Sequence, residues 1–248
     1  MPASAPSRGP GRAAATSLPA ILDAAMALIR AEGLAALTMR RLADELGVWT
    51  RTLYHHVGAD KDRLVTLVVD AIAATIDRPP PDVAWDERLR RLLHGMYDAL
   101  CEYPGIAEYL HEQGVPGPNG IALGEAVALA VHDAGLDAVE AARVSYLLQS
   151  MAFADSHHHP APTNAAKAIC AQRTREQRHQ HELALVPDGA PRSTEQYGEM
   201  AEWPPGEHLD WVIDMAIAHI RARTEPAGRS PDLAPAPSTR GRAVLESS

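Results

Sequence analysis

The sequence predicts an all-α fold, in which a small N-terminal domain with a helix-turn-helix precedes a larger helical domain. Apolar residues recur at i, i+3, i+4 and i+7 along most of the chain, which is the spacing of one buried helical face. Alanine and leucine supply most of the apolar content, whereas aromatic residues make up only 4% of the chain. That composition favours helices. The sequence contains no long alternating β-branched run, so we expect no sheet.

Proline-rich stretches divide the chain. Residues 1–16 are rich in Pro, Ser, Gly and Ala, and residues 225–248 contain four prolines, so both ends are predicted to be disordered. The sequence RPPP at 78–81 ends a helix, because proline lacks the backbone donor and disfavours a helical residue before it. We therefore expect the N-terminal domain over 17–77 and the larger domain over 82–224.

Four helices are predicted in the N-terminal domain, over 18–32, 39–46, 50–56 and about 60–76. The second and third form the helix-turn-helix within the sequence TMRRLADELGVWTRTLYHHV. Thr38 stands where an N-cap belongs, just before the second helix. The inner face of this helix consists of Met39, Leu42, Ala43 and Leu46. Gly47 ends it, because glycine adopts a positive φ at little cost.

The third helix separates an inner from an outer side. Leu53 and Val57 fall on the inner side, whereas Arg51, Tyr54 and His55 share the outer side at i, i+3 and i+4. A short helix with such an exposed face fits the major groove of DNA.

Six helices are predicted in the larger domain, over 84–102, 105–112, 119–134, 137–156, 163–184 and 206–223. The helix over 137–156 is apolar nearly all round, so we expect it to be buried from several directions, including by a second subunit. The helix over 163–184 is polar, and residues 185–204 are expected to be irregular.

Several functional classes are not indicated. No apolar run reaches the roughly 18 residues of a membrane span, and no apolar signal-peptide region occurs at the N-terminus, so we expect a cytoplasmic protein. The two cysteines form no CxxC motif, which indicates neither a disulfide framework nor a zinc ribbon. GxSxG, HExxH, P-loop and GxGxxG motifs are absent, so we expect no enzyme, no catalytic residue, no bound metal and no cofactor.

Charge is distributed unevenly. The net charge of −9 argues against nucleic-acid binding over the whole surface. Residues 1–63, however, hold eight Arg and Lys against six Asp and Glu, so the acidic excess lies in the rest of the chain. This asymmetry is consistent with phosphate binding at one pole.

The motifs LADELGV, TLYHHV and DKDRL together resemble the DNA-binding end of the tetracycline-repressor (TetR) family of transcriptional regulators. The resemblance is close over residues 18–76 and looser to about residue 224. It implies a homodimeric regulator, a repressor that a small-molecule effector releases from a palindromic double-stranded operator. It also implies DNA contacts from Thr38, Arg40, Trp49, Thr50, Arg51, Thr52, Tyr54, His55 and Lys61.

Two features depart from the family pattern. Trp49 stands where the family often has a small polar cap. Either Thr50 takes the cap and shifts the helix start by one residue, or Trp49 lies against the sugar-phosphate wall. The turn Gly-Ala-Asp at 58–60 is one residue longer than usual, which moves Lys61 relative to the phosphates.

The resemblance also implies a ligand pocket between the helices of the larger domain and dimerisation through its 137–156 and 206–223 helices. The pocket candidates are His94, Tyr97, Cys101, Tyr109, Tyr146, Gln149 and Phe153. The expected apolar centre of the interface is Leu147, Met151, Val212, Ile213, Ile217 and Ile220. Ordinary packing within one subunit would equally account for both sets.

The histidine-rich segment also permits a different function. A helical-bundle metal-binding protein or enzyme would use His157, His158 and His159, with His179 and His181. If the chain is a regulator, the sequence also permits an activator in place of the expected repressor.

The exposed cations also have simpler interpretations. Arg40 and Arg51 could be solvated surface residues, and His56 is either exposed or partly buried against the first helix. Arg8 and Arg12 lie either in a solvated tail or in an arm that reaches the minor groove.

Overall fold

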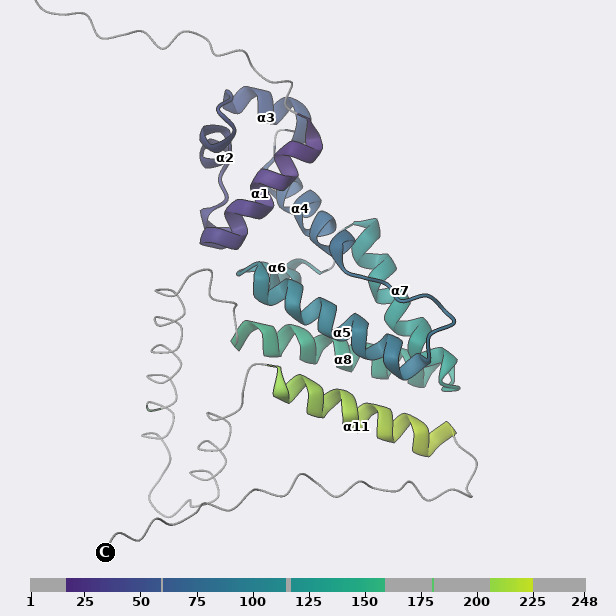
Figure 1. The fold of residues 1–248 in the computed structure, drawn as a ribbon. Helices are drawn as coiled ribbons and strands as arrows, with labels where there is room; N and C mark the ends of the chain where they lie inside the picture. The colour runs from purple at the N-terminus through teal and green to yellow at the C-terminus, as the bar shows by residue number, and fades with distance from the viewer. Residues whose placement is uncertain (1–16, 59, 115–116, 159–179, 181–205, 225–248) are drawn as a thin grey trace, which may run out of the picture.

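The computed structural model describes residues 17–58, 60–114, 117–158, 180 and 206–224, and these contain helices and no strand (Figure 1). The helices are α1 Leu18–Glu32, α2 Met39–Leu46, α3 Thr50–Val57, α4 Lys61–Thr75, α5 Trp85–Glu102, α6 Ile106–Gln113, α7 Pro118–Asp133, α8 Ala138–His158 and α11 Glu207–Thr224. The all-α prediction is therefore confirmed for the described part. None of these helices has the length and apolar character needed to cross a membrane.

The predicted helices agree with the observed bounds to within two residues. One element was not predicted, a short 3₁₀ helix η1 over Leu34–Ala36, which links α1 to α2. The predicted helix over 163–184, the irregular stretch over 185–204 and the two predicted disordered ends lie outside the described residues, apart from Gln180.

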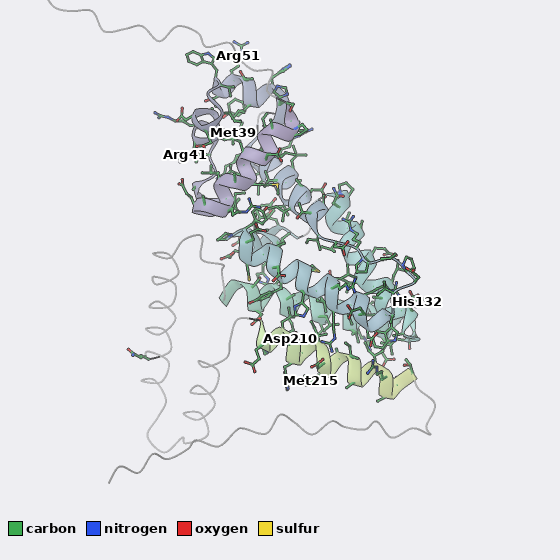
Figure 2. All side chains as sticks on the ribbon, viewed as in Figure 1. Met39, Arg41, Arg51, His132, Asp210 and Met215 are labelled. Carbon is green, nitrogen blue, oxygen red and sulfur yellow. The ribbon has the colours of Figure 1, made fainter. Side chains whose placement is uncertain are left out.

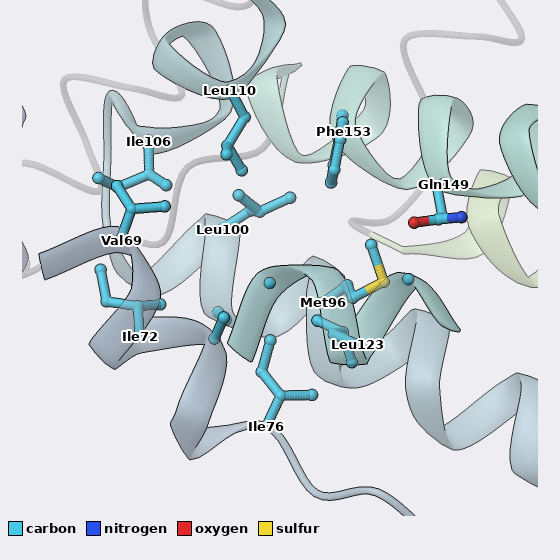
Figure 3. A pocket seen from close by; sticks show the side chains of 14 residues that line it. Val69, Ile72, Ile76, Met96, Leu100, Ile106, Leu110, Leu123, Gln149 and Phe153 are labelled. Atoms are coloured by element: carbon cyan, nitrogen blue, oxygen red, sulfur yellow. The ribbon is translucent and has the colours of Figure 1, made fainter. Parts of the chain in front are cut away.

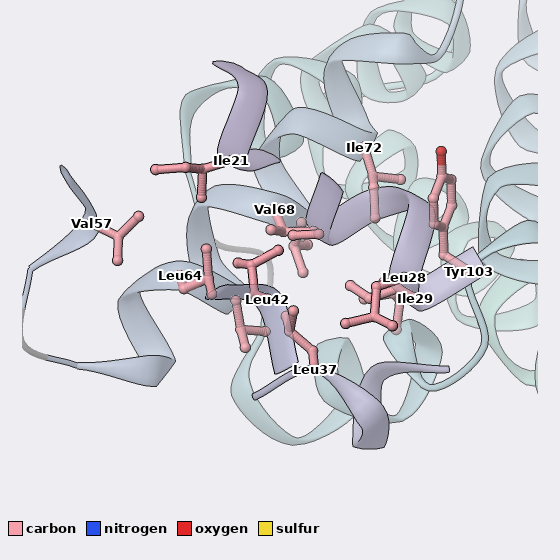
Figure 4. Close-up of a cluster of buried hydrophobic side chains, with 14 of the residues drawn as sticks. Ile21, Leu28, Ile29, Leu37, Leu42, Val57, Leu64, Val68, Ile72 and Tyr103 are labelled. Carbon is pink, nitrogen blue, oxygen red and sulfur yellow. The ribbon is translucent and has the colours of Figure 1, made fainter. Parts of the chain in front are cut away.

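A first hydrophobic core joins α1 to α4 (Figure 4). Ile21, Leu42, Leu53 and Leu64 have no exposed surface, and each comes from a different helix of this group. The same core continues into the end of α5 and into α6 through Ala99, Leu100, Tyr103, Ile106 and Ala107. The apolar packing therefore crosses the boundary that the proline run at 78–81 predicted.

Polar contacts reinforce this junction. Arg30 of α1 lies 2.6 Å from Glu102 of α5, and its guanidinium also donates to the hydroxyl of Tyr103 and stacks 5.0 Å from that ring. The backbone N–H of Leu34 donates to the carbonyl of Pro104. The N-terminal helices are thus attached to the larger domain at more than one point.

A second core lies among α5, α7, α8 and α11, the layered part of Figure 1. The expected dimer centre is corrected here, because four of its residues fill this core within one subunit: Val212, Ile213, Ile217 and Ile220. Helix α8 is buried over only part of its surface within the single subunit, so its expected burial by a second subunit stays a prediction. Leu148 and Ala152 are buried, whereas Val139, Tyr146 and Leu147 are exposed.

Candidate functional site

The helix-turn-helix is built by local signals in the sequence. The Thr38 hydroxyl oxygen caps α2 by accepting a 3.1 Å hydrogen bond from the backbone N–H of Arg41, as predicted. Met39, Leu42 and Ala43 of α2 are buried. Gly47 then ends the helix in the left-handed conformation, at φ 63°, which confirms the role that the sequence predicted for it.

Helix α3 begins at Thr50, and Trp49 occupies its N-cap position without a side-chain capping bond. The expectation that Thr50 takes the cap is therefore wrong. An N-cap requires an extended backbone, which Trp49 adopts, whereas a capping side chain is optional. The first amide groups of α3 thus receive no side-chain cap from Trp49, and its indole is 85% exposed.

The outer side of α3 carries the predicted DNA-contacting residues. Leu53 and Val57 are buried, while Arg51, Tyr54 and His55 are exposed and Thr50 and Thr52 are partly buried. Figure 2 shows Arg51 at the tip of this domain, away from the larger domain. His56 is exposed, which excludes the partly buried arrangement.

Positive charges at this end are available for a ligand. Within the described residues, no ion pair involves Arg40, Arg51 or Lys61, all of which are exposed. Arg41, in contrast, is held 2.9 Å from Glu32 of α1. Arg63 is a further exposed cation, not among the predicted contacts, and its side chain lies beside Gly58 at the end of α3.

The start of α4 follows the prediction. Asp60 caps the helix by accepting a 3.0 Å hydrogen bond from the N–H of Asp62, so Lys61 is the first helical residue. A helix N-terminus favours an anion, and a lysine at that place adds a mobile positive charge. Residue 59 is not among the described residues, so the expected longer turn remains a prediction.

A cavity lies between the two cores, with about 490 Å³ of free space when its open mouth is included (Figure 3). Five helices line it, with Val69, Ile72 and Ala73 from α4 and Ile76 directly after it, Met96, Ala99 and Leu100 from α5, Ile106 and Leu110 from α6, Gly120, Leu123 and Gly124 from α7, and Gln149 and Phe153 from α8. Gln149 is the one polar side chain in this lining. Its Nε2 donates to the carbonyl of Ser145, which leaves its Oε1 as an acceptor beside the cavity.

Two of the seven predicted pocket residues, Gln149 and Phe153, line this cavity. The other five have different surroundings. The Nε2 atom of His94 lies 3.0 Å from Asp210 of α11, the Tyr109 hydroxyl lies 3.4 Å from that of Thr66, and Tyr146 is 76% exposed. Tyr97 and Cys101 are buried in the second core.

Burial controls the protonation of this Tyr97–Cys101 pair. Burial raises the pKa of the Cys101 thiol to about 11. The pKa of Tyr97 is raised further, first by burial and then by Cys101. Both groups are therefore neutral at physiological pH and present no reactive anion.

Most of the residues that line the cavity were not predicted from the sequence. Those from α4, α6 and α7 belong to ordinary apolar stripes, which look the same in sequence whether they fill a core or border a cavity. The small residues Gly120 and Gly124, four apart on α7, are the one signal that could have indicated free space there.

The histidine cluster lies outside the described side chains. Among the described residues, no group of three His, Cys, Asp or Glu side chains is placed to hold a metal ion. The side chains of His157, His158 and His159 lie outside the described part, as do His179 and His181, so the metal-binding alternative stays untested.

Two family descriptions match the chain. Residues 21–66 match the bacterial regulatory proteins of the tetR family, and residues 78–191 match the tetracyclin repressor-like C-terminal domain. A tetracycline repressor protein of class E from Escherichia coli is 33% identical over 138 residues, covering 54% of this chain and 63% of that protein. The transcriptional repressor DrrR1 of Streptomyces coeruleorubidus is 29% identical over 133 residues, or 53% of this chain and 48% of that repressor. The match thus spans about half the length of the Streptomyces relative.

Solved structures share the fold over most of the chain. ActR from Streptomyces coelicolor, crystallised without ligand, superposes with a TM-score of 0.67 at 25% identity, covering 84% of this chain and 96% of ActR. Its complex with actinorhodin superposes with a TM-score of 0.69 at 24% identity, covering 87% and 100% of the two chains. Together, the two family matches, the capped helix-turn-helix and the helical domain that follows it show that this chain belongs to the TetR family of bacterial regulatory proteins.

Proposed function

We propose that this protein is a homodimeric transcriptional repressor, which a small apolar effector releases from a palindromic DNA operator. The observation that supports DNA binding best is the composition of the α3 tip. There a helix N-terminus without a side-chain cap, an exposed indole and cations that pair with no described acidic residue coincide, on a chain whose net charge is −9.

The residues divide by what they can reach. Arg51 stands in the first turn of α3, where its guanidinium can bond a guanine edge in the major groove. Thr50 and Thr52 flank it, and Tyr54 and His55 lie further along α3. We assign the Lys61 side chain to a phosphate.

Three further residues complete the proposed interface. Arg40 reaches from α2 and is exposed. Thr38 uses its hydroxyl oxygen as a cap but retains its O–H as a donor. We assign Trp49 to a contact with a sugar or a thymine methyl, and its exposure within the described part of the subunit supports this.

A dimer would double this interface. One recognition helix reads few base pairs, whereas a twofold pair presents two helices about 34 Å apart or a multiple of that spacing. Exposed apolar side chains on α8 and α11 support a partner there, namely Tyr146, Leu147, Trp211 and Met215. We therefore place the twofold interface on α8 and α11, with these residues at its centre.

The cavity lining indicates the class of effector. No charged side chain lines the cavity, and its one polar side chain offers an acceptor oxygen. A neutral, largely apolar molecule with one N–H or O–H donor fits that surface. Helix α4 forms one wall of the cavity and directly follows the recognition helix α3. A ligand that widens the cavity therefore favours the form that does not bind DNA.

Selection from random double-stranded DNA tests the DNA-binding function. We expect the full-length protein to enrich an inverted repeat, and affinity for it to fall steeply with salt because phosphate contacts release counterions. Fluorescence anisotropy with the selected duplex and with a shuffled duplex of the same composition measures both properties. If no duplex is enriched at low ionic strength, the protein is not a DNA-binding regulator.

A further inference from the structure

The N-terminus of α7 is capped by a residue from α4. The carboxylate of Asp70 accepts three hydrogen bonds, from the Asn119 backbone N–H at 2.7 Å, the Asn119 side-chain amide at 2.8 Å and the Gly120 N–H at 3.3 Å. Asp70 lies 49 residues before Asn119, so this cap is a tertiary contact between two helices.

The start of α7 depends on this external cap. Gly117 occupies the N-cap position and has no side chain, and Pro118 lacks an N–H, so the next two amides need an acceptor from elsewhere. A Cβ atom at Gly117 would stand 2.4 Å from Oδ1 of Asp70. The glycine therefore permits the close approach, and a carboxylate at a helix N-terminus is electrostatically favourable.

A further hydrogen bond reaches Asn119 from the segment that follows the C-terminal end of α4. Arg78 follows α4 and donates to the Asn119 carbonyl at 3.1 Å, and also to the carbonyl of Ala73 at 3.4 Å. Asn119 thus contacts α4 through its side chain and amide, and contacts the segment after α4 through its carbonyl. We call this group, formed by Asp70, Asn119, Gly120 and Arg78, the α4–α7 clamp.

The clamp lies on the wall of the cavity. Val69 and Ala73, on either side of Asp70 in the sequence, line the cavity from α4, and Gly120 lines it from α7. Apolar contacts along the cavity can slide, whereas the hydrogen bonds of the clamp fix one position and one orientation. Any molecule that separates α4 from α7 must therefore strain the clamp.

We propose that Asp70 and Asn119 are positioning residues, whose contact holds α4, and through it the recognition helix α3, in the orientation that binds DNA. This inference rests on the proposed function for its DNA readout. It adds that the polar contact between Asp70 and Asn119 couples the cavity to the helix-turn-helix, in addition to the apolar packing around it.

An exchange of the two side chains tests the coupling. Asn119→Asp places two carboxylates face to face, so we expect α4 to shift and affinity for the selected duplex to fall about tenfold or more. The double variant Asp70→Asn/Asn119→Asp restores one N–H···O contact between the side chains. Its new amide oxygen at position 70 still accepts from the backbone N–H groups of α7. We expect it to bind DNA within about threefold of the unmodified protein.

A distance measurement reports the orientation without DNA. Spin labels at Glu45→Cys in α2 and Glu125→Cys in α7, in a chain that carries Cys170→Ser, give the distance distribution between the two domains by pulsed electron resonance. We expect a narrow distribution in the labelled protein, a broad or shifted one with Asn119→Asp, and a narrow one again in the double variant.

Asp137→Asn is the matched control, because Asp137 also caps a helix, through the N–H groups of Val139 and Glu140, but joins no two domains. It should lower thermal stability while leaving the distances and DNA affinity unchanged. The proposal is overturned if Asn119→Asp leaves the DNA affinity and the label distances as they are in the unmodified protein. It is also overturned if Asn119→Asp lowers the DNA affinity and the double variant does not restore it. If the protein enriches no duplex, the proposed function fails, and the distance measurement still decides whether the clamp sets the orientation.

Discussion

Arg51 and Arg41 are the same residue type in the same helix-turn-helix, but their surroundings differ. Arg41 is neutralised by Glu32 of α1, whereas Arg51 is exposed at the tip of α3 and belongs to no ion pair of the described residues. Sequence spacing alone separates inner from outer residues on a helix. It does not show which outer cation is already paired, because the partner Glu32 comes from another helix.

We expect Arg51→Ala to weaken binding to the selected duplex by about 1–3 kcal/mol and to relax the preference at one base pair, because a bidentate base contact is lost. Anisotropy titrations with the selected duplex and its single-base variants measure both effects. Arg41→Ala should leave affinity and preference nearly unchanged. An unchanged base preference in Arg51→Ala would remove that residue from direct readout.

Lys61→Ala should weaken binding to all duplexes alike and reduce the slope of log affinity against log salt concentration by about one unit.

Cys101 provides a prediction on pH. Its folded-state pKa of about 11 exceeds the ordinary value of 9.0 because the thiol is buried. The unfolded chain therefore releases this proton first, and the free energy of unfolding should fall as pH rises from about 9 to 11, by on the order of 2 kcal/mol. The raised pKa of Tyr97 acts in the same direction. Urea titrations over this pH range should show a shallower decline in Cys101→Ala, and an equal decline would mean that the thiol is not protected.

At the scale of elements, the sequence predicted those helix starts and ends that are set by nearby residues. Thr38, Gly47 and Asp60 cap or end their helices as expected, because each acts within a few residues of itself. The Asp70 cap of α7 and the cavity lining were not predictable in this way. Both join helices that are distant in sequence, and an apolar stripe does not reveal what it faces.

Helix α7 allows the cavity to be tested by filling it. We expect Gly124→Leu to abolish binding of a neutral apolar probe with an N–H donor, N-phenyl-1-naphthylamine, because the new side chain occupies the space beside Gln149. Probe fluorescence measures binding, and thermal denaturation without probe checks the fold. Ala122→Leu is the control, since Ala122 is exposed on the same helix and does not line the cavity. Equal probe binding by both variants would place the ligand elsewhere.

At the scale of the whole molecule, exposure within one subunit distinguishes core residues from interface residues. The interface expected from the family resemblance included Val212, Ile213, Ile217 and Ile220, but these residues are buried in the second core of the same chain. Exposed apolar residues on α8 and α11 fall between these core positions, and Leu147 alone of the expected set is both apolar and clearly exposed. The sequence did not reveal that α11 packs its regular stripe inward, because an apolar stripe has the same pattern in a core and at an interface.

The dimer prediction follows from that exposure. Leu147 of α8 is 54% exposed and Met215 of α11 is 47% exposed in the single subunit, so a charge at either place costs the monomer little. In a twofold interface the same charge is buried, and each substitution occurs twice. We therefore expect the double variant Leu147→Glu/Met215→Glu to be monomeric and folded. It should bind a single half-site, and its affinity for the complete inverted repeat should be lower than that of the dimer. Light scattering after size exclusion gives the mass, and circular dichroism checks the fold. Leu129→Glu on α7, which changes a residue of similar exposure on another face, should remain dimeric. A dimeric double variant, or a monomeric Leu129→Glu, would move the interface away from α8 and α11.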